Sequence, residues 1–419
     1  APPPGGGQYV AGLPRLFLTD QTVTLEQEDR TVSPDITQAL AVPVLLNGRF
    51  DDRNDRDWFS FEAEKGQRLY FDIYGDRLGH QMDLDAAILD TSGKTLITFP
   101  DAPLDKTAPP VLSQPSLDVS GSWKATADGV FRLVVRDLYG SSLFGVDRTY
   151  VLSLRTPQPS FDVIAVPSQG ESPGGHTIPQ AGRTAIPVSL IRRDGFTGPV
   201  QVSLSAASRA AGLTVDECWI GPGVSSGLAI LSLPAGVQPP SPVHFLKLQA
   251  ASQARPDLFG QVRAVTLLRS GELTGRVMSG LPVSFASAKP VDMQLTLQEP
   301  DVPADGSLKL TIRHTVRQGS LQQPVTIEFP GFPGTLKTPA TTTSTDGTPI
   351  ELPIPADLMP GPYSLAARVT GTFRDEATGK SRDADPKSPS GQEQPFRVWT
   401  NSISFQVQAA AETPSASPE

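Results

Sequence analysis

Apolar side chains recur at every second position in many short segments of the chain, and clusters of Gly, Pro, Asn and Asp separate these segments. Such alternation is typical of β-strands that bury one face. Pro or Gly also interrupts nearly every window of a dozen residues, and either residue disfavours the interior of a helix. The pattern therefore predicts an all-β protein built from short strands.

The predicted strands fall into three groups along the chain. They cover residues 58–63, 68–74, 130–136 and 150–154 in the first group, 185–191, 200–204, 227–233 and 243–249 in the second, and 291–297, 307–313, 325–329, 363–370 and 402–407 in the third. Turn residues follow one another roughly every 8 to 12 positions in the later groups, as in immunoglobulin-like sandwiches. We therefore predict three serial β-sandwich domains in this chain of 419 residues.

Proline-containing segments at 156–159 and 286–290 separate the three groups and predict short, stiff linkers. The predicted domains cover residues 20–157, 158–287 and 288–409. Residues 1–19 are expected to be a linker or the end of a preceding domain, and the small-residue, Pro-rich segment 410–419 a disordered tail. The charged, Gly/Pro-rich segment 375–394 is expected to form a long exposed hairpin loop.

Composition narrows the function further. A net charge of −9 disfavours nucleic acid and anionic membranes as partners, because both bind clustered Lys and Arg. The apolar stretches are far shorter than the roughly 20 residues that span a bilayer. A single cysteine excludes an intrachain disulfide, so packing alone must hold each domain together.

Five segments of the first group carry a family resemblance: LLNGRF at 45–50, DRDWFSF at 55–61, EKGQR at 64–68, ADGVFRLVV at 127–135 and YVLSL at 150–154. In order and spacing, residues 25–154 resemble the bacterial pre-peptidase C-terminal domain. The resemblance implies a jelly-roll-like sandwich of the kind appended to secreted hydrolases and surface proteins. The two later groups resemble bacterial immunoglobulin-like modules.

Some members of that family hold calcium with acidic residues just before the first strand and a carboxylate from the sandwich. The matching positions here are Glu26, Glu28 and Asp29, which Asp55 and Asp57 could join. Calcium takes six to eight oxygen ligands, and carboxylates supply them. The Pro-Asn that usually follows the second Glu is absent here. The resemblance thus implies a possible calcium site, and the alternative is a solvated acidic loop.

Motifs for catalysis are weak. The sequence Gly-Val-Ser-Ser-Gly at 223–227 fits a nucleophile elbow around Ser225, but a predicted strand follows it instead of a helix, which favours a plain β-turn. Cys218 has no neighbouring cation to activate it, so it is expected to be a buried, inert side chain. The four histidines, at positions 80, 176, 244 and 314, are too dispersed for local zinc spacing. His244 and His314 also lack an evident acidic partner. We predict no enzyme.

Three aromatic residues near strand ends, Tyr74, Tyr139 and Phe144, are candidates for a binding edge, although aromatic residues of a sandwich more often belong to its core. The leading hypothesis is a non-catalytic binding or spacer region of a larger exported or surface protein. It would act at the bacterial cell surface, outside the cell or in the periplasm, on a protein or polysaccharide. The alternatives are a self-associating subunit of a surface lattice or fibre, and an accessory region of a secreted hydrolase with an upstream catalytic domain.

Overall fold

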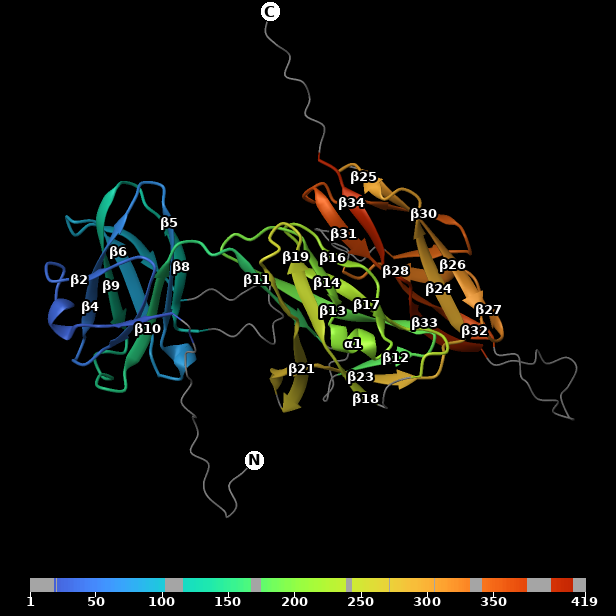
Figure 1. Ribbon diagram of the computed structural model, residues 1–419, viewed down its shortest axis with the longest axis horizontal. Coiled ribbons are helices and arrows are strands. Elements are labelled where there is room, and N and C mark those ends of the chain that lie inside the picture. The colour runs from blue at the N-terminus through green and yellow to red at the C-terminus, as the bar shows by residue number, and fades with distance from the viewer. Residues whose placement is uncertain are drawn as a thin grey trace, which may run out of the picture. The chain divides into compact units, whose positions relative to one another are not determined.

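The computed structural model describes residues 19, 21–101, 116–166, 175–238, 243–270, 272–304, 306–331, 341–374 and 393–409. The predictions for residues 1–18, 375–392 and 410–419 lie outside this part. Strands dominate the described residues, which confirms the all-β class, and the single α-helix among them is α1 (Ala206–Ala210) (Figure 1). No helix in the described ranges has the length and apolar character to cross a bilayer. The chain divides into two compact units, and the first ends at Pro159.

The first unit is a sandwich of two five-stranded sheets, ordered β1-β3-β10-β5-β8 and β2-β4-β9-β6-β7. Its elements are β1 (Val23–Leu25), η1 (Glu28–Arg30), β2 (Gln38–Leu40), β3 (Val44–Arg49), β4 (Arg56–Ala63), β5 (Arg68–Tyr74), η2 (Asp76–Leu78), β6 (Leu84–Leu89), β7 (Thr95–Phe99), β8 (Val119–Lys124), β9 (Gly129–Asp137) and β10 (Thr149–Arg155). All four strands predicted here are present. Phe59 and Phe61 of one sheet and Phe71 of the other belong to a single buried core, as the alternation requires.

The second unit begins with a sandwich whose sheets are ordered β15-β17-β13-β11-β21-β22, β12-β23-β18 and β16-β14-β19-β20. Its strands are β11 (Ser160–Ala165), β12 (His176–Pro179), β13 (Gly182–Arg193), β14 (Val200–Leu204), β15 (Thr214–Val215), β16 (Cys218–Ile220), β17 (Ser226–Leu233), β18 (Val243–Leu246), β19 (Leu248–Ser252), β20 (Phe259–Gln261), β21 (Arg263–Ser270), β22 (Glu272–Met278) and β23 (Leu281–Ala286). The strand predicted at 243–249 is interrupted at Lys247, and its halves join different sheets. The core of this second sandwich is continuous and separate from the core of the first unit.

The rest of the second unit forms a third sandwich with its own core. Its strands are β24 (Val291–Leu297), β25 (Asp301–Val302), β26 (Ser307–Val316), β27 (Ser320–Leu321), β28 (Val325–Glu328), β29 (Thr341–Ser344), β30 (Pro349–Pro353), β31 (Gly361–Leu365), β32 (Arg368–Arg374), β33 (Glu393–Trp399) and β34 (Ile403–Val407). The strand predicted at 363–370 is two strands, because the chain changes sheets at residues 366–367. β32 and β33 pair in an antiparallel register.

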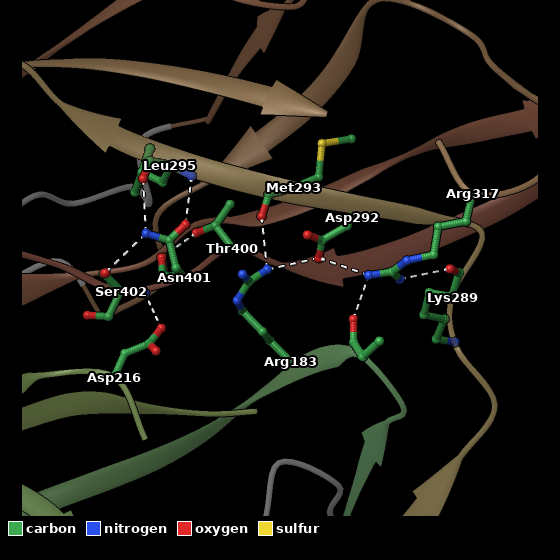
Figure 2. Close-up of polar contacts among 11 residues, drawn as sticks. Arg183, Asp216, Lys289, Asp292, Met293, Leu295, Arg317, Thr400, Asn401 and Ser402 are labelled. Carbon is green, nitrogen blue, oxygen red and sulfur yellow. Dashed lines mark hydrogen bonds and ion pairs between the residues drawn. The ribbon is translucent and has the colours of Figure 1, made fainter. Parts of the chain in front are cut away.

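The second and third sandwiches pack against each other inside the second unit. Ala185 and Ile230 of the second sandwich form a buried apolar cluster with Ala366 of the third. Beside this cluster, the carboxylate of Asp292 lies between two guanidinium groups (Figure 2): Arg183 Nη1 is 2.8 Å away and Arg317 Nη2 is 3.9 Å away. Arg317 also donates to the carbonyl of Ala181 at 2.6 Å, so each arginine bridges the two sandwiches.

A tyrosine side chain interlocks the same two sandwiches. Tyr363 on β31 is 1% exposed, and its ring lies directly over Gly221, which follows β16. Its hydroxyl donates to the carbonyl of Met359 at 2.7 Å. Arg192 holds the loop under the ring by donating to the carbonyls of Gly221 at 2.6 Å and Val224 at 3.0 Å. Polar and apolar contacts thus join two sandwiches for which the sequence predicts only a short linker.

Candidate functional site: the loop end of the first sandwich

Three loops of the first sandwich meet at one end of it: β3–β4, β5–β6 and β9–β10. Strand register shows this, because Arg49 at the end of β3 pairs with Thr149 at the start of β10, and Leu84 at the start of β6 pairs with Asp137 at the end of β9. The chain leaves the sandwich from the opposite end of β10, at Arg155. We call this surface the loop end. It contains the predicted calcium residues and the predicted binding aromatics.

Glu26 and Asp55 are held at the loop end by backbone hydrogen bonds. Glu26 directly follows β1, and its Oε2 accepts from the Arg49 N–H at 2.8 Å. Asp55 closes the β3–β4 turn because its Oδ2 accepts from the N–H groups of Asp51 at 3.0 Å and Asp52 at 3.4 Å. These bonds fix two short acidic segments side by side.

Asp57, one of the predicted ligands, is buried inside the sandwich. It lies within β4, is 1% exposed, and its Oδ2 accepts from the hydroxyl of the fully buried Tyr150 at 2.7 Å. Burial, followed by the charge of Glu26, raises the pKa of Asp57 well above its usual range. Burial likewise raises the pKa of Glu26.

Arg49 supplies positive charge to this cluster. Its Nη2 lies 2.5 Å from Asp51 Oδ2 and 3.7 Å from Glu28 Oε1. Burial and the charges of Glu26, Asp51 and Asp55 still raise the pKa of Glu28 to about 7. We call Glu26, Glu28, Asp51, Asp55 and Asp57 the acidic cluster. Asp51 was not among the candidate residues predicted from the sequence.

The acidic cluster does not fit a preformed calcium site. Asp29, a predicted ligand, has an exposed side chain in η1 and no described contact with the cluster. Across the described ranges, no group of three or more His, Cys, Asp or Glu side chains has an arrangement that could hold a metal ion. Calcium requires several oxygens that converge on one point, whereas here a guanidinium lies beside Asp51 and Glu28.

An apolar surface lies beside the acidic cluster, on the β9–β10 loop. Leu138 is 52% exposed, Tyr139 37%, Phe144 46% and Val146 78%. We call these four residues the apolar loop. It adjoins the acidic β3–β4 turn, because the N–H of Asn54 donates to the carbonyl of Gly140 at 2.9 Å. Two of the predicted binding residues, Tyr139 and Phe144, are therefore exposed on one loop.

The apolar loop is anchored although its side chains face solvent. Asp137 and Arg148, at its two ends, form a buried ion pair at 2.5 Å. The other carboxylate oxygen of Asp137 accepts from the N–H groups of Asp83 and Tyr139, each at 3.0 Å. The N–H of Gly145 donates to the carbonyl of Phe50 at 2.8 Å. A loop held this way presents its side chains with little entropy left to lose on binding.

Tyr74, the third predicted binding residue, is less available. It ends β5 and is half-buried, and the guanidinium of Arg77 covers its ring at 4.3 Å from the centroid. Arg77 is itself fixed by Asp118, whose Oδ2 accepts from its Nε at 2.5 Å. Tyr74 thus supports the loop end and is not part of the apolar loop.

The other candidate residues have structural positions. Ser225 precedes β17, and its carbonyl accepts from the N–H of Leu190 at 2.8 Å, so the Gly-x-Ser-x-Gly segment is a turn that leads into a strand. Cys218 is buried, and burial raises the pKa of its thiol to about 12. His314 does have an acidic partner, contrary to expectation, because its Nδ1 lies 3.0 Å from Asp346 Oδ1. That pair lies on the third sandwich, whereas Ser225 lies on the second.

The class that the fold defines is the multidomain β-sandwich protein. No family model matches the chain, and no curated protein matches its sequence. Among solved structures it is similar to the pre-peptidase C-terminal domain of a collagenase from Bacillus anthracis, at 11% identity and a TM-score of 0.21 over 28% of this chain and 94% of that one. It is also similar to fibronectin(III)-like modules of CbhA from Clostridium thermocellum, at 13% identity and a TM-score of 0.16 over 61% and 100% of the chains. The adhesin FdeC of Escherichia coli follows at 12% identity and a TM-score of 0.18 over 66% and 80%. Likenesses this weak say nothing about function.

Proposed function

We propose that the chain is a non-catalytic binding and spacing region of a larger exported or surface protein of a bacterium. In this proposal the first sandwich is a module like the pre-peptidase C-terminal domain and binds a protein through its loop end. The second unit is a stiff spacer. The observation that carries the proposal is the apolar loop, because four exposed apolar side chains on a well-anchored loop are costly in water unless a partner covers them.

A protein is favoured over a polysaccharide as the partner. Leu138 and Val146 are aliphatic and lie on the same loop as the two rings, whereas sugar stacking relies on flat aromatic faces. Asp52 and Asp147 are exposed acidic residues on the turn and the loop that form this surface. We therefore expect a segment that combines apolar side chains with Lys or Arg.

Binding to whole bacterial cells tests the proposal, with and without protease treatment of the cells. The wild-type chain should bind untreated cells, lose binding after protease treatment, and bind less as salt increases, because salt screens exposed charges. A double variant, Tyr139→Ser with Phe144→Ser, should lose most binding without a change in melting temperature. Val130→Ser is the matched control, since Val130 is 45% exposed at the start of β9. Binding that survives the double variant, or survives protease but not glycosidase, contradicts the proposal.

The spacing function is supported by the interlock between the second and third sandwiches. A spacer transmits distance only if its modules do not bend against each other, and the arginines around Asp292 and the buried Tyr363 connect both modules. Calorimetry of the full chain should show one cooperative transition for the second unit. Two separable transitions within that unit would contradict a stiff spacer.

A further inference from the structure

The side chain and backbone of Arg49 contact three members of the acidic cluster. One side of its guanidinium is 2.5 Å from Asp51 and 3.7 Å from Glu28, and its own N–H donates to Glu26 at 2.8 Å. One residue therefore contacts both short segments, 26–28 and 51–55, from which an oxygen-ligated cation would draw its ligands.

We propose that the guanidinium of Arg49 replaces a divalent cation in the first sandwich, so that this sandwich folds and keeps its loop end without calcium. A second cation beside Arg49 would meet like charge at close range, and its ligands would have to leave the guanidinium first. Arg is suited to this position because it stays charged and presents several donors in a rigid plane.

The neighbouring residues are consistent with a built-in cation. Asp29 has its side chain in solvent. Among the described residues, two buried carboxylate oxygens, Glu26 Oε1 and Asp51 Oδ1, have no hydrogen-bond partner. The cluster therefore keeps acceptor capacity that a cation could use once Arg49 is removed.

The test compares the full chain in EDTA and in millimolar CaCl2, using calorimetry for the melting temperature of the first unit and hydrogen exchange for peptides covering residues 26–31 and 50–57. The wild-type chain should show the same melting temperature and the same exchange in both buffers. Arg49→Gln should melt lower in EDTA, by roughly 5 °C, and lose protection in both peptides. Calcium should restore both in this variant, and titration calorimetry should detect binding to Arg49→Gln only.

Two further variants separate charge from packing. Arg49→Lys keeps the positive charge and should remain insensitive to calcium. Arg53→Gln removes an exposed arginine of the same turn and should behave as the wild type. If Arg49→Gln folds only when calcium is present, the proposal is supported in its strongest form. It is overturned if calcium stabilises the wild-type chain through Glu28, shown by loss of the effect in Glu28→Gln, or if calcium fails to restore Arg49→Gln.

Discussion

Gly221 lies in the contact between the second and third sandwiches, and Gly221→Ala should separate them there. A Cβ at this position would lie 2.0 Å from Cε1 and 2.3 Å from Cδ1 of Tyr363. Real Cβ atoms do not approach other atoms so closely, so the ring must leave its site. The backbone of Gly221 is not in the left-handed region, and alanine would otherwise be tolerated there or slightly stabilising. The whole cost therefore comes from Tyr363.

The cost follows from what Tyr363 loses. Its ring is 1% exposed and stacks on Phe405 at a centroid distance of 5.6 Å, and its hydroxyl donates to Met359 at 2.7 Å. Partial exposure of a buried aromatic ring costs about 2 kcal/mol, and loss of one hydrogen bond costs about 1 kcal/mol. We expect Gly221→Ala to destabilise the second unit by about 3 kcal/mol.

Urea denaturation with hydrogen exchange of peptides from β16 and β31 measures this loss on both sides of the contact. Gly260→Ala is the control, because nothing lies within 4 Å of its added Cβ and its backbone is also outside the left-handed region. A double-mutant cycle isolates the contact: with Tyr363→Ala already present, Gly221→Ala should cost no more than about 0.5 kcal/mol. Equal costs in both backgrounds would refute the interlock.

Three other predictions concern buried polar groups. Burial lowers the pKa of His176 to about 4, so between pH 6.5 and 4 the unfolded chain binds a proton that the folded chain excludes. The second unit should therefore lose up to about 3 kcal/mol of stability as the pH falls through this range. His176→Gln should remove that part of the pH dependence in urea denaturation. Asp118→Ala should destabilise the first unit by about 3 kcal/mol in the same assay, because three backbone N–H groups in the β5–β6 loop lose their acceptor. The control Asp90→Ala, on an exposed turn, should have a much smaller effect. Tyr150→Phe should cost about 1 to 2 kcal/mol and raise the pKa of Asp57 further, since its hydroxyl is the donor to that carboxyl; an unchanged pKa measured by NMR would contradict this role.

Strand positions were readable from sequence because alternation reports a buried face directly. The strand at 68–74 was predicted with its observed bounds, as were those at 200–204 and 291–297. Errors arose where the chain changes sheets without a turn signal. At 243–249 and 363–370 the apolar pattern continues through the break, so period-two alternation alone cannot show that two strands in different sheets are present.

The candidate site was only partly readable. The clustering of Glu26, Glu28 and Asp55 followed from the family resemblance, and the exposure of Tyr139 and Phe144 followed from their position near strand ends. The role of Arg49 could not be found in this way. It lies on the same strand as Leu45 and Leu46, in a segment that carried the resemblance, and only the register between β1 and β3 brings it to Glu26.

The Gly-x-Ser-x-Gly segment shows how an apparent catalytic motif can have a packing role. Gly223 has a φ of 71°, which glycine tolerates and other residues rarely adopt, and the loop before it is tied down by Arg192. Val224 of this segment packs against the cores of both the second and the third sandwich. Gly223 and Val224 thus belong to the same Arg192-anchored loop as Gly221, which lies against Tyr363. In urea denaturation Ser225→Ala should leave the stability of the second unit nearly unchanged, whereas Val224→Ala should destabilise it, because Val224 packs against both cores.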